Sequence, residues 1–262
     1  MPQPLIVANW KLYPTLSDSL VLAASLKSEL EKLRGVHVVL APPLPWLVSV
    51  IEHWQHRTGN VDFAAQNLWP DDQGAYTGEV SAYMVKDLVR FALVGHSERR
   101  LHAREDDDLI REKVQACLRW QIRPIVCIGE QKPVIDEAGK TDSYQWQRLE
   151  RQLMEALHGV KEEQVRKIVV AYEPIWAISK SGVNNPAKPE YAAAVIRKIR
   201  DRLGEKYSRT AADELTILYG GSVTAETAAD YLRQPGINGL LPGAASVKAK
   251  EFLKICTVAA RV

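Results

Sequence analysis

The stretch FALVGHSERRLHAREDDDLIREKVQACLRWQIRPIVCI, residues 91–128, contains the unit that decides the fold. It begins with a short apolar run, 91–95, continues through a segment with helical spacing, 106–120, and ends in a second apolar run, 124–128. In the middle segment apolar residues recur three or four positions apart with charges between them, which predicts an amphipathic helix. The two apolar runs are continuous rather than alternating, as is typical of parallel strands covered on both faces. The stretch therefore predicts a strand–helix–strand unit.

The same alternation runs along the whole chain. Six further apolar runs rich in β-branched residues predict strands: LIVAN (5–9), HVVLA (37–41), VDFAA (61–65), IVVAY (168–172), TILY (216–219) and NGLLPG (238–243). Helical spacing recurs at 16–33, 144–157, 189–203 and 224–234. Because no composition break or Gly/Ser linker interrupts the pattern, we expect residues 1–262 to form a single α/β domain. Eight units in about 250 residues favour a closed eight-stranded barrel over an open doubly wound sheet, and no GxGxxG motif follows the first run.

The composition of the chain indicates which partners and which cellular compartment to expect. Lysine and arginine total 34 against 32 aspartates and glutamates, so the charge gives no reason to expect nucleic acid as a partner. The chain has three scattered cysteines, which is too few for a disulfide framework and favours a cytoplasmic location. No apolar run reaches the ~18 residues needed to cross a bilayer, and the N-terminus lacks the pattern of a signal peptide. We expect a soluble, cytoplasmic protein without a membrane partner.

Polar and glycine-rich segments follow five of the predicted strands. They are Asn9-Trp10-Lys11, Gly95-His96-Ser97-Glu98, Glu173-Pro174, Gly220-Gly221-Ser222 and Gly243-Ala244-Ala245-Ser246. Each has an ordinary explanation by itself, because lysines after strands are usually solvated and Gly-Gly-Ser is a common turn. In a closed parallel barrel, however, all five would meet on the rim formed by the carboxyl ends of the strands, where such barrels carry their active sites.

Together these segments could carry out a proton transfer on a phosphorylated carbonyl compound. The glycine-bearing segments at 220–222 and 243–246 offer backbone N–H groups to a phosphate. Lys11 could stabilise an oxyanion, and a neutral His96 at a helix start could donate a hydrogen bond to a carbonyl oxygen. The apolar sequence after Glu173 would partly desolvate its carboxylate, as suits a base that removes a proton from carbon. The six histidines show no HExxH or HxH spacing, so we expect no metal and no cofactor.

Seven segments resemble, in order and spacing, the signature segments of the triosephosphate isomerase family. They are ANWKLY (8–13), AAQNLWPDDQGAYTGEVS (64–81), LVGHSERR (93–100), VCIGE (126–130), VVAYEPIWAI (169–178), LYGGSV (218–223) and GLLPGAAS (239–246). The resemblance runs from residue 5 to about 247 and implies a single-domain (β/α)8 TIM barrel. It also implies a cofactor-free isomerase that interconverts dihydroxyacetone phosphate and D-glyceraldehyde 3-phosphate through an enediolate.

The resemblance assigns a role to each matching residue. Glu173 matches the general base and His96 the neutral electrophile. Asn9 and Lys11 match residues that stabilise the oxyanion and the phosphate, and Glu98 matches the carboxylate that holds the lysine. Ser222, Gly243 and Ala244 match phosphate-binding positions of the family. The N–H of Ser179 joins them when the lid, the segment after the sixth strand, closes. Tyr219 matches the residue that holds this lid closed. The segment 66–81 resembles a loop that reaches into a partner subunit, with Thr77 at the contact, so we expect a homodimer; a tetramer stays open.

Two departures keep alternatives open. The family's lid usually has glycines where this chain has Ser179 and Ser181, which predicts an altered lid equilibrium, and the usual Val-Gly-Gly after the last strand is Pro242-Gly243-Ala244. These changes leave room for a related isomerase of a longer phosphorylated ketose, such as a tetrulose phosphate. A third hypothesis, beside the two isomerases, is a barrel that binds phosphate without catalysis. This hypothesis predicts that the base or the electrophile is lost, yet Glu173 and His96 are both present.

Overall fold

Eight parallel strands close into a barrel in the computed structural model, which describes residues 3–55, 59–136, 138–178 and 186–262. Each strand pairs with the next in the chain, and β8 pairs back with β1. The strands are β1 (Leu5–Asn9), β2 (His37–Ala41), β3 (Val61–Ala65), β4 (Phe91–Val94), β5 (Arg123–Ile128), β6 (Val169–Tyr172), β7 (Thr216–Gly221) and β8 (Gly239–Pro242). The predicted closed α/β barrel is confirmed.

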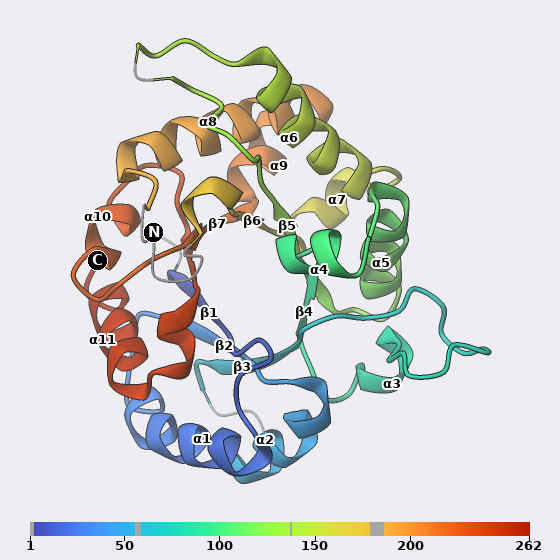
Figure 1. The fold of residues 1–262 in the computed structure, drawn as a ribbon, viewed down its shortest axis with the longest axis vertical. Coiled ribbons are helices and arrows are strands. Elements are labelled where there is room, and N and C mark those ends of the chain that lie inside the picture. The colour runs from blue at the N-terminus through green and yellow to red at the C-terminus, as the bar shows by residue number, and fades with distance from the viewer. Residues whose placement is uncertain (1–2, 56–58, 137, 179–185) are drawn as a thin grey trace.

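Helices surround the ring of strands (Figure 1). They are α1 (Leu16–Leu30), α2 (Leu47–His53), α3 (Ala82–Val85), α4 (Ser97–His102), α5 (Asp107–Arg119), α6 (Ser143–Ala156), α7 (Glu162–Val165), α8 (Pro189–Lys206), α9 (Arg209–Glu214), α10 (Ala228–Leu232) and α11 (Ala249–Ala259). Three short 3-10 helices, η1 (Leu44–Trp46), η2 (Ile175–Ala177) and η3 (Ala244–Val247), follow strands β2, β6 and β8. In the described residues no helix is both long enough and apolar enough to cross a membrane.

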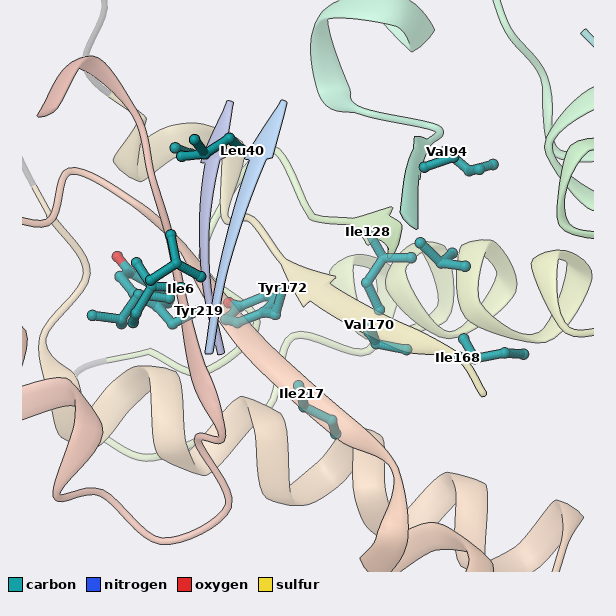
Figure 2. Close-up of a cluster of buried hydrophobic side chains, with 14 of the residues drawn as sticks. Ile6, Leu40, Val94, Ile128, Ile168, Val170, Tyr172, Ile217 and Tyr219 are labelled. Atoms are coloured by element: carbon teal, nitrogen blue, oxygen red, sulfur yellow. The ribbon is translucent and has the colours of Figure 1, made fainter. Parts of the chain in front are cut away.

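The strands are apolar on both faces because each face packs against a different layer. Alternate residues such as Leu5 and Val7 form a cluster with Leu93 and Leu218 that fills the barrel. The intervening residues belong to a larger cluster shared with the helices. Figure 2 shows part of this larger cluster, including Ile6, Leu40, Val94, Ile128, Ile168, Val170, Tyr172, Ile217 and Tyr219. The continuous apolar runs thus reflect two buried faces.

Helix starts follow local capping chemistry. Thr15 caps α1 in a reciprocal capping box with Asp18, while Asp106 and Asp142 cap α5 and α6 through their carboxylates. The helix expected at 224–234 is shorter, and α10 begins only at Ala228. The reason is a turn in which the backbone N–H of Thr224 donates to the hydroxyl of Thr227 at 3.1 Å. Sequence spacing also did not single out α11.

Candidate active site

Residues from five of the predicted strand ends line one cavity of about 330 Å³ at the carboxyl ends of the strands. The cavity brings together Asn9 at the end of β1, Lys11 after it, His96 after β4, Glu173 after β6, Ser222 after β7, and Gly243 and Ala244 after β8. Residues that lie more than 200 positions apart in the chain thus share one site, as expected for a closed barrel.

Glu173 lies at the base of this cavity and is only 5 % exposed. Its backbone N–H donates to the carbonyl of Ile128 at 2.8 Å, which extends the pairing of β5 with β6 and fixes where the side chain starts. Gly220 leaves room for that side chain, because a Cβ there would lie 2.6 Å from Cγ of Glu173. Oε2 of Glu173 is buried and has no hydrogen-bond partner among the described residues. Packing thus fixes the position of the carboxylate beside the cavity.

His96 faces Glu173 across the cavity and is held in one tautomer. It caps α4, and its Nδ1 accepts the backbone N–H of Glu98 at 3.3 Å. An Nδ1 that accepts a hydrogen bond carries no proton, so the proton of the neutral ring is on Nε2. Nε2 lies 3.5 Å from Oε1 of Glu173. The ring therefore presents an N–H donor to whatever lies beside the base.

Lys11 is held by its backbone and by an ion pair. Its φ of 50° is in the left-handed region, where a side chain costs of order 1–3 kcal/mol and persists only if its surroundings fix it. Oδ1 of Asn9 accepts the Lys11 N–H at 3.0 Å, and the amide of Gln66 donates to the Lys11 carbonyl at 3.1 Å. Nζ of Lys11 lies 2.7 Å from Oε1 of Glu98. Burial alone would raise the pKa of Glu98, but the hydrogen bond and charge of Lys11 outweigh it and lower that pKa.

The segments after β7 and β8 form a further wall of the cavity. The hydroxyl of Ser222 donates to the carbonyl of Ala177 at 3.4 Å, which ties this wall to the segment after Glu173. The N–H of Gly243 donates to the carbonyl of Gly221 at 3.2 Å, so it takes part in the pairing of β7 with β8. Ala244 is exposed at the start of the four-residue helix η3. Pro242 ends β8 and faces Gly221 in the register.

Of the other predicted positions, Glu98, Tyr219 and Thr77 do not line this cavity. Tyr219 is fully buried in β7, where it stacks on Tyr231 with ring centroids 4.3 Å apart, and its hydroxyl has no partner among the described residues. Thr77 is exposed in the segment between β3 and α3, which extends away from the barrel in Figure 1. Ser179 lies outside the described residues, as does Ser181.

Sequence reasoning gave no role to Glu130, a buried carboxylate beside the segment that carries Glu173. Its Oε1 accepts hydrogen bonds from the hydroxyl of Tyr172 at 2.9 Å, Nε1 of Trp176 at 2.8 Å and the hydroxyl of Tyr191 at 3.3 Å. Burial raises the pKa of Glu130, although these donors oppose the effect. Two further cavity residues, Lys248 and Glu251, were also missed. Within the part of the chain that the structure describes, no group of three or more His, Cys, Asp or Glu side chains could hold a metal ion.

Known proteins resemble this chain over nearly its entire length. A family model described as triosephosphate isomerase matches residues 4–259. The chain belongs to the triosephosphate isomerase family. A triosephosphate isomerase of Dehalococcoides mccartyi is 40 % identical over 260 residues, which cover 99 % of this chain and 98 % of the relative. The triosephosphate isomerase of Fusobacterium nucleatum subsp. nucleatum is 39 % identical over 97 % of this chain and 98 % of the relative. That of Caldanaerobacter subterraneus subsp. tengcongensis is 38 % identical over 97 % of this chain and 99 % of the relative.

Membership of the triosephosphate isomerase family confirms the resemblance found in the seven sequence segments. The alternative of an isomerase for a longer phosphorylated ketose finds no support, because the relatives are named for triose phosphate.

Proposed function

We propose that this chain interconverts dihydroxyacetone phosphate and D-glyceraldehyde 3-phosphate by proton transfer through an enediolate. The observation that carries the proposal is the pair formed by Glu173 and His96, with Nε2 of the histidine 3.5 Å from a carboxylate oxygen in a shared cavity. A base next to a neutral donor is what removal of a proton beside a carbonyl group requires. The family of the chain and the names of its relatives support the same reaction.

Each partner of the pair has one part in the chemistry. Glu173 removes a proton from one substrate carbon and returns it to the adjacent carbon. A carboxylate that its surroundings hold beside the cavity is suited to this, because it is positioned before the substrate binds. His96 donates its Nε2–H to the carbonyl oxygen and stabilises the negative charge that develops there.

Lys11 and Asn9 complete the reaction end of the cavity. The ammonium group of Lys11 lies near the developing oxyanion and is positioned by Glu98 at 2.7 Å. Asn9 is 6 % exposed and accepts the Lys11 N–H, which holds the lysine in its left-handed conformation. Because these groups are fixed before the substrate binds, little reorganisation is needed in the transition state.

The phosphate would bind between the segments after β7 and β8, at Ser222, Gly243 and Ala244. These residues line the same cavity as Glu173, so a three-carbon substrate could reach from this wall to the base. The N–H of Ala244 has no intramolecular acceptor among the bonds of the described residues, whereas that of Gly243 is shared with Gly221. The part assigned to Ser179 and to a lid, latched by Tyr219, rests on the family resemblance.

A homodimer is part of the proposal. Exposed apolar side chains gather on the segments that follow β1, β3 and β4: Leu12 is 97 % exposed, Met84 62 % and Leu101 64 %. A second cavity of about 440 Å³ adjoins Lys11 and is lined by Leu12, Gln66 and His102 among others. The protruding segment 66–81 of a second copy would cover these apolar groups and bring Thr77 to that cavity.

Sedimentation of the full chain and of its Thr77→Arg variant tests the homodimer. We expect the unchanged chain to sediment as a dimer and the variant to dimerise more weakly.

Two further expectations also remain proposals. The three cysteines Cys117, Cys127 and Cys256 are free and buried, which supports a reducing, cytoplasmic compartment. A single domain spanning 1–262 is supported by one closed ring of strands.

The reaction itself is tested by a coupled assay of D-glyceraldehyde 3-phosphate isomerisation beside a tetrulose phosphate. We expect turnover of the triose phosphate with a kcat/KM at least about a hundredfold above that of the tetrulose phosphate. A protein that turns over neither substrate, or prefers the longer one, would refute the proposed function.

A further inference from the structure

Lys248 lines the same cavity as Glu173 and Ser222, four positions after Ala244. Its backbone is held on both sides, because its N–H donates to the carbonyl of Ala245 at 3.1 Å and its carbonyl accepts from Phe252 at 2.9 Å. The side chain is exposed and forms no ion pair with any other described residue. Lys248 therefore lines the wall after β8 from a fixed backbone.

The charges around the cavity show why this lysine matters. The lining contains two carboxylates, Glu173 and Glu251, and two lysines, Lys11 and Lys248. Lys11 is already paired with Glu98 at 2.7 Å. Among the described residues that line this cavity, a phosphate dianion therefore meets two carboxylates and one lysine whose charge is not committed to an acid.

Glu251 does not neutralise Lys248 by an ion pair. Its Oε1 accepts the backbone N–H of Ala225 at 2.8 Å, which joins α11 to the segment after β7. The carboxylate is thereby turned to a backbone donor, and the ammonium group of Lys248 stays available to an anion. A lysine acts as a compact point charge on a long stem, so it can attract a dianion without a fixed bidentate geometry.

We propose that Lys248 is a phosphate-recognition residue, which supplies the uncommitted positive charge at the β7–β8 wall and speeds the capture of the substrate dianion. This inference rests on the proposed function, since it names the recognition group for the phosphate of the same substrate. It assigns Lys248 to capture and binding, and leaves the proton transfer to Glu173 and His96.

The test compares Lys248→Gln with Lys248→Arg and with Lys250→Gln in the full-length protein. Lys250 is exposed, lies two positions further on and does not line the cavity, so its variant removes the same charge from the same helix start. Binding of inorganic phosphate is measured by calorimetry, and kcat/KM for D-glyceraldehyde 3-phosphate is measured over a range of ionic strength.

We expect Lys248→Gln to weaken phosphate binding and to lower kcat/KM by about 3- to 10-fold at low salt, while kcat stays nearly unchanged. The difference in kcat/KM between this variant and the wild type should shrink at higher salt, because salt screens the charge. Lys248→Arg should keep most of the phosphate affinity and most of kcat/KM. For Lys250→Gln, both quantities should stay within about twofold of the wild type. Equal phosphate affinities for Lys248→Gln and Lys250→Gln would overturn the inference. A wild-type protein that binds phosphate but does not isomerise the triose would instead refute the proposed function, while the binding comparison would still decide the role of Lys248.

Discussion

The Nε2 atom of His96 lies 3.5 Å from the Oε1 atom of Glu173, although the two residues follow different strands of the barrel. The first strand end supplies a donor whose tautomer is fixed by the backbone N–H of Glu98, and the second supplies a buried carboxylate. Their proximity makes one site of two segments that look ordinary when each is considered alone.

Replacement of His96 by asparagine should lower kcat and leave phosphate binding intact. The shorter amide cannot reach the substrate carbonyl, so the loss should be roughly 100- to 1000-fold in kcat, as for the removal of one preorganised donor. Phosphate affinity should stay within about twofold, because the β7–β8 wall is untouched. His53→Asn, at an exposed position on α2, is the control. A kcat equal to that of the control would remove His96 from the mechanism.

The ion pair of Lys11 with Glu98 should make stability depend on pH at the acid end. Lys11 lowers the pKa of Glu98 against the opposing effect of burial, so the folded state binds the proton less readily than the unfolded chain does. The stabilisation is therefore complete above the unfolded pKa of about 4.3 and is lost as the pH falls through the lower folded value. Glu98→Gln should flatten this acid limb in thermal unfolding.

The matched control for this experiment is Glu163→Gln, which removes an exposed carboxylate on α7. Its acid limb should follow that of the wild type. Parallel acid limbs for the wild type and Glu98→Gln would show that the ion pair contributes nothing to the stability of the folded state.

Glu251 should hold the segment after β7 against the segment after β8, the two segments of the β7–β8 wall. Because its carboxylate accepts the N–H of Ala225, Glu251→Ala leaves that backbone donor without its partner and should cost about 1–3 kcal/mol of unfolding free energy. Glu251→Gln retains an acceptor and should keep most of the stability. Inhibition by inorganic phosphate should weaken several-fold in the alanine variant and not in the glutamine variant. Identical inhibition constants for the two variants would refute the positioning role.

The strands could be predicted closely because both of their faces are buried. Residues 5–9, 37–41 and 61–65 were expected as strands and form β1, β2 and β3 with those bounds. Strand β7 runs on to Gly221, beyond the predicted 216–219, because the glycines after Tyr219 continue the pairing with β8. Glycine gives no apolar signal, so this extension could not be predicted from the pattern.

The site was predictable where a residue ends a strand or lies within two positions of its end. Asn9 ends β1, His96 lies two positions after β4 and Glu173 directly follows β6, and the closed barrel places them on one rim. Glu130 also follows a strand, but its partners Tyr172, Trp176 and Tyr191 come from distant segments, and no local pattern signals them. Lys248 and Glu251 are separated from β8 by the helix η3, so they look like the solvated start of a surface helix.

The most direct test of the central claim is the turnover of Glu173→Gln with D-glyceraldehyde 3-phosphate. Glutamine keeps the size and hydrogen bonding of the side chain but cannot accept a proton from carbon. We predict a fall in kcat of at least about 100-fold, a KM within a few-fold of the wild type and an unchanged unfolding temperature. A variant that folds normally and turns over at the wild-type rate would contradict the account.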